Sequence, residues 1–539
     1  MKPSAPTTNS PTVDSPCAPP AQSFWPAWRW WLAPALVALI LALLFLDPFI
    51  GDWDGLDYTV LALRGQPSSM ALGRALFIYT NHALYSIAHT LFGLRAENAY
   101  LLFKYAVVAQ SPLAVIACWT LARDLTHRVE TATIAALLVA VSPAFIIYSG
   151  QVMTDVPSVL LLAVALIIHL RGLHNRSLWM VLAGAALLGA SANVRESVLF
   201  YAPWLVIAPF VCGRKMGRRE LIAIALSVLI FLIFASGIFA YLFIADVGGF
   251  RASWHGWRES MRAEAARHPV TIRNALPFVI YFFGVAPMVV VALPVAAFRE
   301  WRARGFSPLL ALAGVGLWAN LLLIFNYSTT INWRYFLTGL PALTPLVARY
   351  FIDEQSARWG DVRRAFVSVV LGLAFITIVF SIYMKPTSRE HIMKRALTKD
   401  YGARLAHVPR DAVVMAGGQT VAVTYWRGIG TGEWDTIGTG GGWPGAELAS
   451  VIETYLQNGR RVFLDADPRW WSPCGWQLEE TRQLVELESR FHFRRISDTI
   501  FEIRPLADDS ARDVPNLKTL LPENRDAEVK KCPGLQRLT

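Results

Sequence analysis

Charged residues are scarce in this sequence. Asp, Glu, Lys and Arg make up 17% of the 539 residues, whereas 54% are hydrophobic. Soluble domains carry about 25% charged residues, so this composition excludes an ordinary soluble protein and indicates a membrane protein. The formal net charge of +11 does not indicate a nucleic-acid partner. The basic residues stand in short clusters between apolar runs, which is how membrane proteins encode their orientation.

Cysteine is also scarce. The five cysteines, Cys17, Cys118, Cys212, Cys474 and Cys532, are scattered, and none belongs to a CxxC pair or a zinc-type spacing. We therefore expect no disulfide framework and interpret the cysteines as small apolar residues. A pair between Cys474 and Cys532 stays open, with nothing in the sequence to support it.

A nucleotide-binding pattern is absent as well. The glycine-rich run at 430–445 fits no phosphate-loop spacing, and we interpret it as a flexible loop. Asp465 and Asp467 form a DxD motif after a strand-like stretch, as in the metal sites of soluble nucleotide-sugar transferases. Because no nucleotide-binding pattern surrounds this motif, we interpret it as a turn at the end of a strand.

Long apolar runs are abundant. A helix needs about 20 apolar residues to cross a bilayer, and the runs predict about eleven spans. We place them near residues 28–50, 98–122, 131–148, 155–171, 178–192, 197–212, 220–245, 274–298, 308–326, 335–352 and 365–384.

The basic residues alternate along these predicted spans. With a cytoplasmic N-terminus, every predicted inner loop carries arginine, whereas the outer turn YSGQVMT has no basic residue and NVRES has one. This is the positive-inside pattern. An odd number of spans places the C-terminus on the extracytoplasmic side. The inner clusters lie at 123–128, 171–176, 214–219, 299–304 and 349–364.

The composition also indicates the domain organisation. Residues 1–23, rich in Pro, Ser and Thr, are expected to form a disordered cytoplasmic tail. The next apolar run lacks a clear cleavage site, so we interpret it as a retained anchor. We expect a transmembrane domain at 24–384, a small extracytoplasmic α/β domain at 385–507 and a polar tail at 508–539. In the α/β domain, strand-like stretches alternate with helix-like ones such as 478–491.

Two predicted outer loops are long. Residues 51–97 have apolar residues at helical spacing with polar interruptions, which predicts one or two amphipathic helices in the membrane interface. Residues 246–273 are basic and contain tryptophans. They are interpreted either as an interfacial helix on anionic lipid or as a segment that captures an anionic lipid substrate.

Three acidic residues follow the first span directly. Asp52, Asp54 and Asp57 lie in GDWDGLDY with no basic residue among them. A carboxylate at a membrane surface can take a proton from a hydroxyl or amine, or help to hold a divalent cation. The alternative is a group of solvated acids with no role in chemistry.

Further ionisable residues stand where predicted helices meet the same outer face. Asp155 begins a span after an outer turn, where it is expected to cap the helix together with Thr154. Arg195 lies on the next outer turn, and Arg334 and Tyr335 precede another span. Ionisable groups at such positions are candidates for function. Their convergence on one face predicts a site there.

These motifs resemble the GT-C superfamily of integral membrane glycosyltransferases, in the protein O-mannosyltransferase and aminoarabinose-transferase branch. The stretch DGLDY, Asp54–Tyr58, is similar to the acidic element that follows the first helix in that branch. Other matches are Arg74, which opens an amphipathic stretch, Ser142 and Pro143 followed by Asp155, Arg195 on the next outer turn, and Arg334, Tyr335 and Pro341.

The sequence departs from the pattern of that branch at two kinds of position. Gly55 stands where the branch has a second acid, so Asp52 or Asp57 would have to substitute for it. Arginine also replaces lysine at two places. Because arginine offers a planar fork and lysine a point charge, the donor headgroup would be held differently.

The resemblance implies a GT-C-like fold and transfer of a sugar from a polyprenyl-phosphate donor to a protein, lipid or glycan acceptor, with inversion. Asp54 would be the base, supported by Asp155, Asp52 and Asp57. Arg74, Arg195 and Arg334 would bind the donor phosphate, and Tyr58 and Tyr335 the substrate.

The resemblance leaves a metal cofactor open. Either no metal is used, or Mg²⁺ or Mn²⁺ binds between Asp54 and Asp155. The expected location is a bacterial inner or plasma membrane, with membrane lipids as partners. The alternative class is a multi-pass transporter or lipid flippase. A transporter would show an internal repeat or charges at the bilayer midplane, and the sequence has no clear repeat.

Overall fold

The computed structural model describes residues 28–46, 53–69, 72–213, 217–267, 282–326, 333–377, 401–417, 420–429, 433–437, 448–467, 484 and 486–506. The contacts divide the chain into two units. The helical unit comprises Met1–Leu46, Gly65–Leu91 and Leu101–Lys385. The C-terminal unit comprises Asp47–Arg64, Phe92–Tyr100 and Pro386–Thr539. Each unit is described by itself.

The helical unit consists of helices and short connections. Its α-helices are α1 (Trp28–Leu44), α3 (Ala75–Phe92), α4 (Ala99–Thr126), α5 (Val129–Ala140), α6 (Pro143–Ser149), α7 (Asp155–His174), α8 (Leu178–Ala192), α9 (Pro203–Val211), α10 (Arg218–Ile244), α11 (Phe250–Arg267), α13 (Pro287–Arg304), α14 (Pro308–Asn326) and α15 (Leu340–Trp359). The 3₁₀ segments are η2 (Glu196–Tyr201), η3 (Val247–Gly249) and η4 (Trp333–Gly339). A further helix occupies 362–377.

Every predicted span contains a helix, but fewer helices meet a strict criterion for crossing a membrane. Among the described residues, Ala96–Thr126, Asp155–His174 and Arg218–Ile244 are long and apolar enough. The pair α5 and α6 would add a fourth span if it is one broken crossing. Several other helices are apolar but shorter, such as Leu178–Ala192 and Pro308–Leu322. The number of eleven spans therefore stays a prediction.

The predicted span at 131–148 is broken between α5 and α6. The two helices are bent by 64° relative to each other. Ser142 begins α6 as its N-cap, since its hydroxyl accepts from the Phe145 backbone N–H at 3.4 Å, and Pro143 occupies the first turn. Proline lacks the N–H that would continue α5, so the sequence itself requires the break. The bend leads the chain into the turn before α7.

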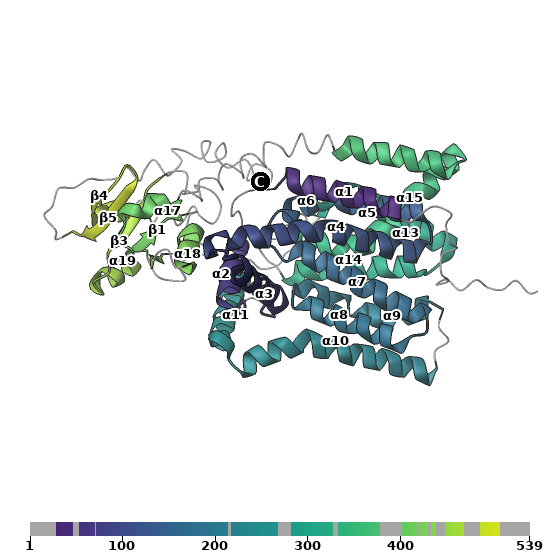
Figure 1. Ribbon diagram of the computed structural model, residues 1–539, viewed down its shortest axis with the longest axis horizontal. Coiled ribbons are helices and arrows are strands. Elements are labelled where there is room, and N and C mark those ends of the chain that lie inside the picture. The colour runs from purple at the N-terminus through teal and green to yellow at the C-terminus, as the bar shows by residue number, and fades with distance from the viewer. Residues whose placement is uncertain are drawn as a thin grey trace, which may run out of the picture. The chain divides into compact units, whose positions relative to one another are not determined.

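Helices α7, α8 and α10 pack side by side, as Figure 1 shows. Two glycines permit the close approach of α7 and α8. A Cβ atom on Gly172 would lie 2.5 Å from the Val181 backbone nitrogen, and one on Gly184 would lie 2.6 Å from that of His169. Small residues at such contacts let membrane helices approach backbone to backbone. This packing fixes the turn after α8, which carries Arg195.

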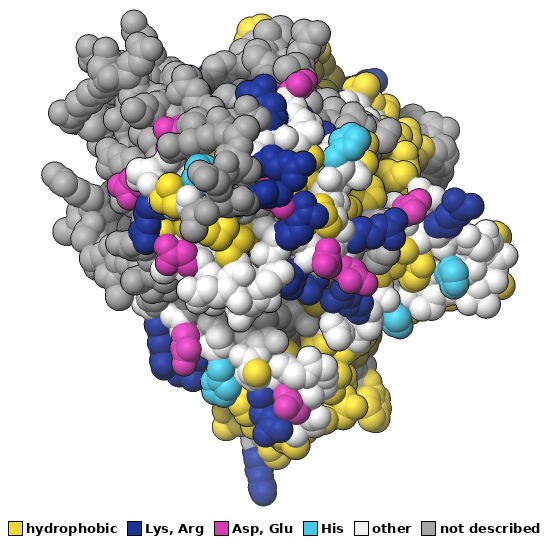
Figure 2. Space-filling view, turned by 90° about the vertical axis from the view of Figure 1, so that its left-hand side faces the viewer, with side chains coloured by type: hydrophobic (Ala, Val, Ile, Leu, Met, Phe, Trp, Pro, Cys, Tyr) yellow, Lys and Arg dark blue, Asp and Glu magenta, His cyan; other side chains and the backbone are white. Residues whose placement is uncertain are grey.

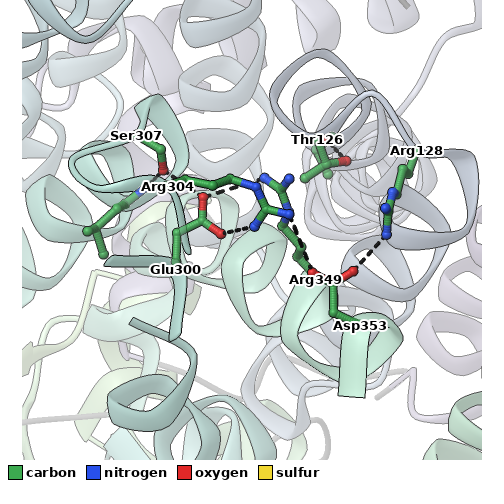
Figure 3. Close-up of polar contacts among 9 residues, drawn as sticks. Thr126, Arg128, Glu300, Arg304, Ser307, Arg349 and Asp353 are labelled. Atoms are coloured by element: carbon green, nitrogen blue, oxygen red, sulfur yellow. Dashed lines mark hydrogen bonds and ion pairs between the residues drawn. The ribbon is translucent and has the colours of Figure 1, made fainter. Parts of the chain in front are cut away.

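One end of the helical unit is joined by a network of ion pairs, drawn in Figure 3. Glu300 of α13 accepts from Ser307 at 2.8 Å and pairs with Arg304 at 2.8 Å and Arg349 of α15 at 3.5 Å. Asp353 of α15 pairs with Arg128 at 2.7 Å. These arginines come from three predicted inner loops, so the structure brings those loops together at one end of the helices.

The C-terminal unit contains the predicted α/β domain. Its elements are α17 (Tyr401–Arg404), η5 (Leu405–His407), β1 (Val413–Met415), α18 (Thr420–Gly428), β2 (Asp435–Thr436), α19 (Leu448–Gln457), β3 (Val462–Asp465), β4 (Phe491–Arg495) and β5 (Ile500–Pro505). The sheet has the strand order β2-β1-β3-β5-β4. Strand β1 pairs in parallel with β2 and β3, whereas β5 pairs antiparallel with β3 and β4.

The central strands of this domain are buried, and charged residues lie at its surface. Val462, Phe463 and Leu464 of β3 are buried in the core, as expected for a strand covered on both faces. At the surface, Asp435 pairs with Arg427 and Arg460. Figure 2 views the molecule from the side where the strands lie in Figure 1, and shows basic and acidic side chains interspersed on that face.

The structure refines two sequence predictions about this domain and one about the cysteines. The glycine-rich run at 430–445 contributes β2 to the sheet, and most of the run lies outside the described residues. Phe491 begins strand β4, whereas the sequence pattern places it at the end of a helix. Of the cysteines, Cys118 and Cys212 are buried, and the other three lie outside the described residues.

Candidate functional site

The turn before α7 brings together the first residues of the candidate site. Asp155 lies in the first turn of α7 and is fully buried. Thr154 occupies the N-cap position, but its side chain makes no capping hydrogen bond, which corrects the expectation that it caps the helix. The Thr154 hydroxyl instead accepts from Nη1 of Arg195 at 3.2 Å.

Arg195 lies on the turn between α8 and η2, directly opposite Asp155. Its Nη1 atom is 2.6 Å from Oδ1 of Asp155, and the side chains are 2% and 0% exposed. Nη2 of Arg195 has no hydrogen-bond partner among the described residues. A buried charge is tolerated when it is paired and hydrogen-bonded, so the ion pair explains why both charged side chains can be buried.

Arg334 and Tyr335 reach the same place from η4. The centre of the Tyr335 ring lies 5.2 Å from the Arg195 guanidinium carbon and 5.3 Å from that of Arg334. Nη1 of Arg334 donates to Sδ of Met153 at 3.5 Å. Arginine over an aromatic ring is favourable, more so where water is excluded. The structure thus unites Asp155, Arg195, Arg334 and Tyr335, which the sequence predicts to converge.

Arg74 is attached to this cluster through an acid that the sequence analysis did not identify. Nη2 of Arg74 is 3.3 Å from Oε1 of Glu196, and Glu196 follows Arg195 directly. Arg74 has a φ of 44°, in the left-handed region that non-glycine residues seldom adopt. A signal was present in NVRES, where the acid stands next to the basic residue on an otherwise uncharged outer turn.

The acidic element after the first span belongs to the C-terminal unit. Asp54, Asp57 and Tyr58 lie on α2 (Trp53–Arg64), and Asp52 lies outside the described residues. Tyr58 is 1% exposed, whereas Asp54 and Asp57 are half-buried. The sequence predicts one or two helices in segment 51–97, and the structure has two, α2 and α3. Their place in the membrane interface stays a prediction.

The second long outer loop contains α11. Trp254 packs against Phe239 and Phe243 of α10, with ring centres 5.7 Å apart in both contacts. The Arg258 guanidinium lies over the Trp254 ring at 5.3 Å. Helix α11 therefore packs on α10 through Trp254. The two interpretations of this segment, contact with anionic lipid or capture of a lipid substrate, stay predictions.

Asp465 and Asp467 of the DxD motif are enclosed in the C-terminal domain. The Arg404 guanidinium contacts Asp465 at 3.0 Å and Asp467 at 3.4 Å. The Tyr401 hydroxyl donates to Asp465 at 3.0 Å, and the Asp467 backbone N–H donates to the same carboxylate at 3.1 Å. These contacts agree with the interpretation of a turn after β3. Burial, and next the Asp465 carboxylate, raises the pKa of Tyr401 well above its ordinary value of 10.0.

The described residues do not form an evident metal site. The Asp155 carboxylate, which the sequence offers as a ligand, contacts the Arg195 guanidinium at 2.6 Å, and a cation bound there would have to displace that contact. In the part of the chain that the structure describes, no group of three or more His, Cys, Asp and Glu side chains is placed to hold a metal. The expectation of Mg²⁺ or Mn²⁺ between Asp54 and Asp155 stays a prediction.

Comparison with known proteins supports the resemblance seen in the motifs. Residues 80–239 match the family model described as dolichyl-phosphate-mannose-protein mannosyltransferase. This segment includes Asp155 and Arg195. No curated protein sequence gives a significant match.

Solved structures share the fold at low sequence identity. ArnT from Cupriavidus metallidurans in the apo state has a TM-score of 0.54 and 14% identity, over 88% of this chain and 98% of that chain. The apo oligosaccharyltransferase from Archaeoglobus fulgidus has a TM-score of 0.50 and 13% identity, over 83% and 70%. Its complex with Zn and sulfate has a TM-score of 0.51 and 13% identity, over 88% and 73%. The partial match to the family model and the shared fold both support the resemblance to GT-C membrane glycosyltransferases.

Proposed function

We propose that this protein transfers a sugar from a polyprenyl-phosphate donor to a protein, lipid or glycan acceptor on the extracytoplasmic face of a bacterial inner or plasma membrane. The observation that supports this most strongly is the buried Asp155–Arg195 pair at 2.6 Å beside Arg334 and Tyr335. A lipid-linked donor needs cationic groups where membrane helices end, because its phosphate is anionic while its chain stays in the bilayer. No contact of the described residues favours a transporter or a lipid flippase.

The arginines are proposed to hold the donor phosphate. Arg195 uses Nη1 for Asp155 and Thr154, which leaves Nη2 without a partner among the described residues. A guanidinium fixed in this way can present its remaining N–H groups to phosphate oxygens with little loss of side-chain entropy. Arg334 stacks on the same tyrosine, and Arg74 is oriented by Glu196. Tyr335 would then set the spacing between two of the cations.

The acids of α2 are proposed to activate the acceptor. Asp54 takes the proton from the acceptor hydroxyl or amine as its oxygen or nitrogen bonds to the anomeric carbon of the sugar. The bond between that carbon and the phosphate oxygen breaks, and polyprenyl phosphate leaves with both electrons. Attack from the opposite side inverts the anomeric centre. Asp52 and Asp57 are the alternative bases, and Tyr58 is a proposed substrate contact.

The proposal is tested with purified protein and radiolabelled polyprenyl-phosphate mannose, glucose, galactose and aminoarabinose. Each donor is incubated with a membrane extract that supplies acceptors, and label is followed into the protein, lipid and glycan fractions. We expect one donor to label one fraction. Equal label with and without the protein for every donor would contradict the proposal. A parallel incubation with EDTA, followed by Mg²⁺ or Mn²⁺, decides whether a cation is needed.

A further inference from the structure

The acidic helix α2 is packed on the C-terminal domain, although it follows the first span in sequence. Leu56 and Val60 of α2 form a small buried cluster with Tyr425 of α18. The Nη2 atom of Arg64 lies 3.5 Å from the carbonyl oxygen of Gly428, a residue 364 positions later in the sequence. Accordingly, α2 groups with the C-terminal unit and not with the helices on either side of it in the chain.

The packing face of α2 is defined by its sequence. Leu56, Val60 and Arg64 recur every four residues and therefore form one stripe along the helix. At about 100° per residue, Asp54 lies about 120° from the centre of that stripe and shares a different side of the helix with Tyr58. The contact of the stripe with α18 therefore sets the rotation of α2 about its axis, and with it the direction of Asp54.

Gly428 permits this contact because it has no side chain. A Cβ atom at this position would lie 2.6 and 2.7 Å from the two Cγ atoms of Val60. Such distances are far below van der Waals contact, so a larger residue requires the Val60 side chain to rotate or α2 to move away or turn. Gly428 is the last residue of α18.

Tyr425 is the residue of α18 that packs with Leu56 and Val60 in this cluster. It is 2% exposed. Burial, and next the nearby Glu97 carboxylate, raises the pKa of its phenol. Glu97 belongs to η1 (Ala96–Asn98), which is also part of the C-terminal unit. A second segment of the predicted outer loop thus lies near α18.

We propose that the C-terminal domain is the element that positions the catalytic acids, with Gly428 and Tyr425 of α18 as positioning residues that fix the direction of Asp54. This rests on the proposed role of Asp54 in activating the acceptor. The domain then acts on the turnover step, through α2, and not on donor binding. It need not contact the substrate to do so.

The test adds one methyl group and then makes room for it. Gly428→Ala should lower kcat for transfer from the donor that the wild type accepts by at least tenfold, with the donor KM unchanged within about twofold. Adding Val60→Ala to this variant removes both Cγ atoms and should restore kcat to within about threefold of wild type. Gly314→Ala is the matched control, since a Cβ on Gly314 of α14 meets nothing within 4 Å. It should behave as wild type.

A cysteine pair tests the contact without any substrate. A Cβ on Gly428 would be 3.2 Å from that of Val60, near the range of disulfides. Val60→Cys with Gly428→Cys should therefore cross-link in native membranes under mild oxidation, with mass spectrometry identifying the linked peptides. The cross-linked protein should bind donor normally. Absence of the cross-link in a double-cysteine protein that is folded would overturn the proposed contact.

The outcomes separate this inference from the proposed function. If Asp54→Asn abolishes transfer but Gly428→Ala has normal kcat, the positioning role is wrong and the function stands. If Gly428→Ala lowers kcat and the double variant does not recover it, the loss is one of folding and the inference fails. If Asp54→Asn is fully active, the role of the acid is wrong, and the cross-link then reports only a structural contact.

Discussion

Arg195 and Asp155 form a buried ion pair, with Nη1 and Oδ1 2.6 Å apart. The two residues come from different helix ends, and each explains the position of the other. Asp155 compensates a guanidinium that would be costly to bury alone, and the same contact holds that guanidinium in one orientation. A pair of this kind combines a structural role with preparation for an anionic ligand.

The pair predicts strongly non-additive mutations. Arg195→Ala leaves the Asp155 carboxylate buried without its counter-charge, which typically costs about 3–5 kcal/mol. Asp155→Asn with Arg195→Ala removes both charges and should cost clearly less than Arg195→Ala alone. Thermal unfolding in detergent of the two single variants and the double variant completes the cycle. Additive losses would show that the two side chains are not paired in the protein.

The network at the opposite end of the helices predicts a second loss of stability. Glu300 is 4% exposed and joins Arg304, Ser307 and Arg349. Glu300→Ala removes the acceptor that these partners share and leaves Arg304 and Arg349 only their longer contacts with Asp353. We expect a cost of about 1–3 kcal/mol, mainly from the largely buried Arg349. The unfolding temperature in detergent should fall, whereas Glu259→Ala, at an exposed position of α11, should not change it. Equal melting of both variants would contradict the role of the network.

Orientation in the membrane is a separate prediction. We expect Arg218 and Arg302 in the cytoplasm and residues 385–539 outside it, because arginine alternates between the predicted loops. Single-cysteine variants at Arg218, Arg302 and the exposed Ser450, in a protein without its native cysteines, are labelled with a membrane-impermeant maleimide in intact cells. Only the Ser450 variant should react. Labelling of Arg302→Cys from outside would contradict the eleven-span prediction.

Tyr401 predicts a pH dependence of the C-terminal domain. Burial, and next the Asp465 carboxylate, raises the pKa of Tyr401 in the folded domain. Below the pKa of tyrosine in the unfolded chain, about 10, this shift contributes its full stability to the folded domain. As pH rises above that pKa, the unfolded chain ionises first, and the stability is lost. Limited proteolysis of the full-length protein at pH 8 and pH 10.5 measures this.

The control for that experiment is Tyr401→Phe, which cannot ionise. The variant should be cleaved faster than wild type at pH 8, because the hydrogen bond to Asp465 is gone. The difference between the two proteins should narrow at pH 10.5. A difference that widens with pH would contradict the assigned direction of the pKa shift.

The sequence predicted the helices and the convergence of four side chains at helix ends, because both leave local signals. Arginine clusters mark one end of the helices, and Ser142 with Pro143 marks the break before α7. Asp155, Arg195, Arg334 and Tyr335 were identified because ionisable groups at helix ends are conspicuous in an apolar sequence. Glu196 was missed because an acid beside an arginine resembles an ordinary solvated pair.

Two features could not be predicted because they depend on contacts distant in sequence. No local pattern in α2 shows that Val60 meets Gly428, so the assignment of the acidic helix to the C-terminal unit comes only from the structure. Thr154 has a capping residue type at a capping position, yet it accepts from Arg195. Strand β4 begins at Phe491 through pairing with β5, whereas the residues before it favour a helix.

The last prediction concerns the acids of α2. Asp54→Asn preserves the size of the side chain but cannot accept a proton, so transfer should fall by about 10²-fold or more while donor binding changes little. Asp52→Asn and Asp57→Asn should be milder. Arg195→Lys keeps the charge but loses the fork, and should instead weaken donor binding. All four variants are compared in one assay of kcat and donor KM, with expression and melting checked for each.

If Asp52→Asn or Asp57→Asn is the inactive variant, the base lies elsewhere within GDWDGLDY. If none of the three acids matters, the acceptor is activated by another group and the proposed mechanism fails, although the arginine cluster would still bind an anionic donor.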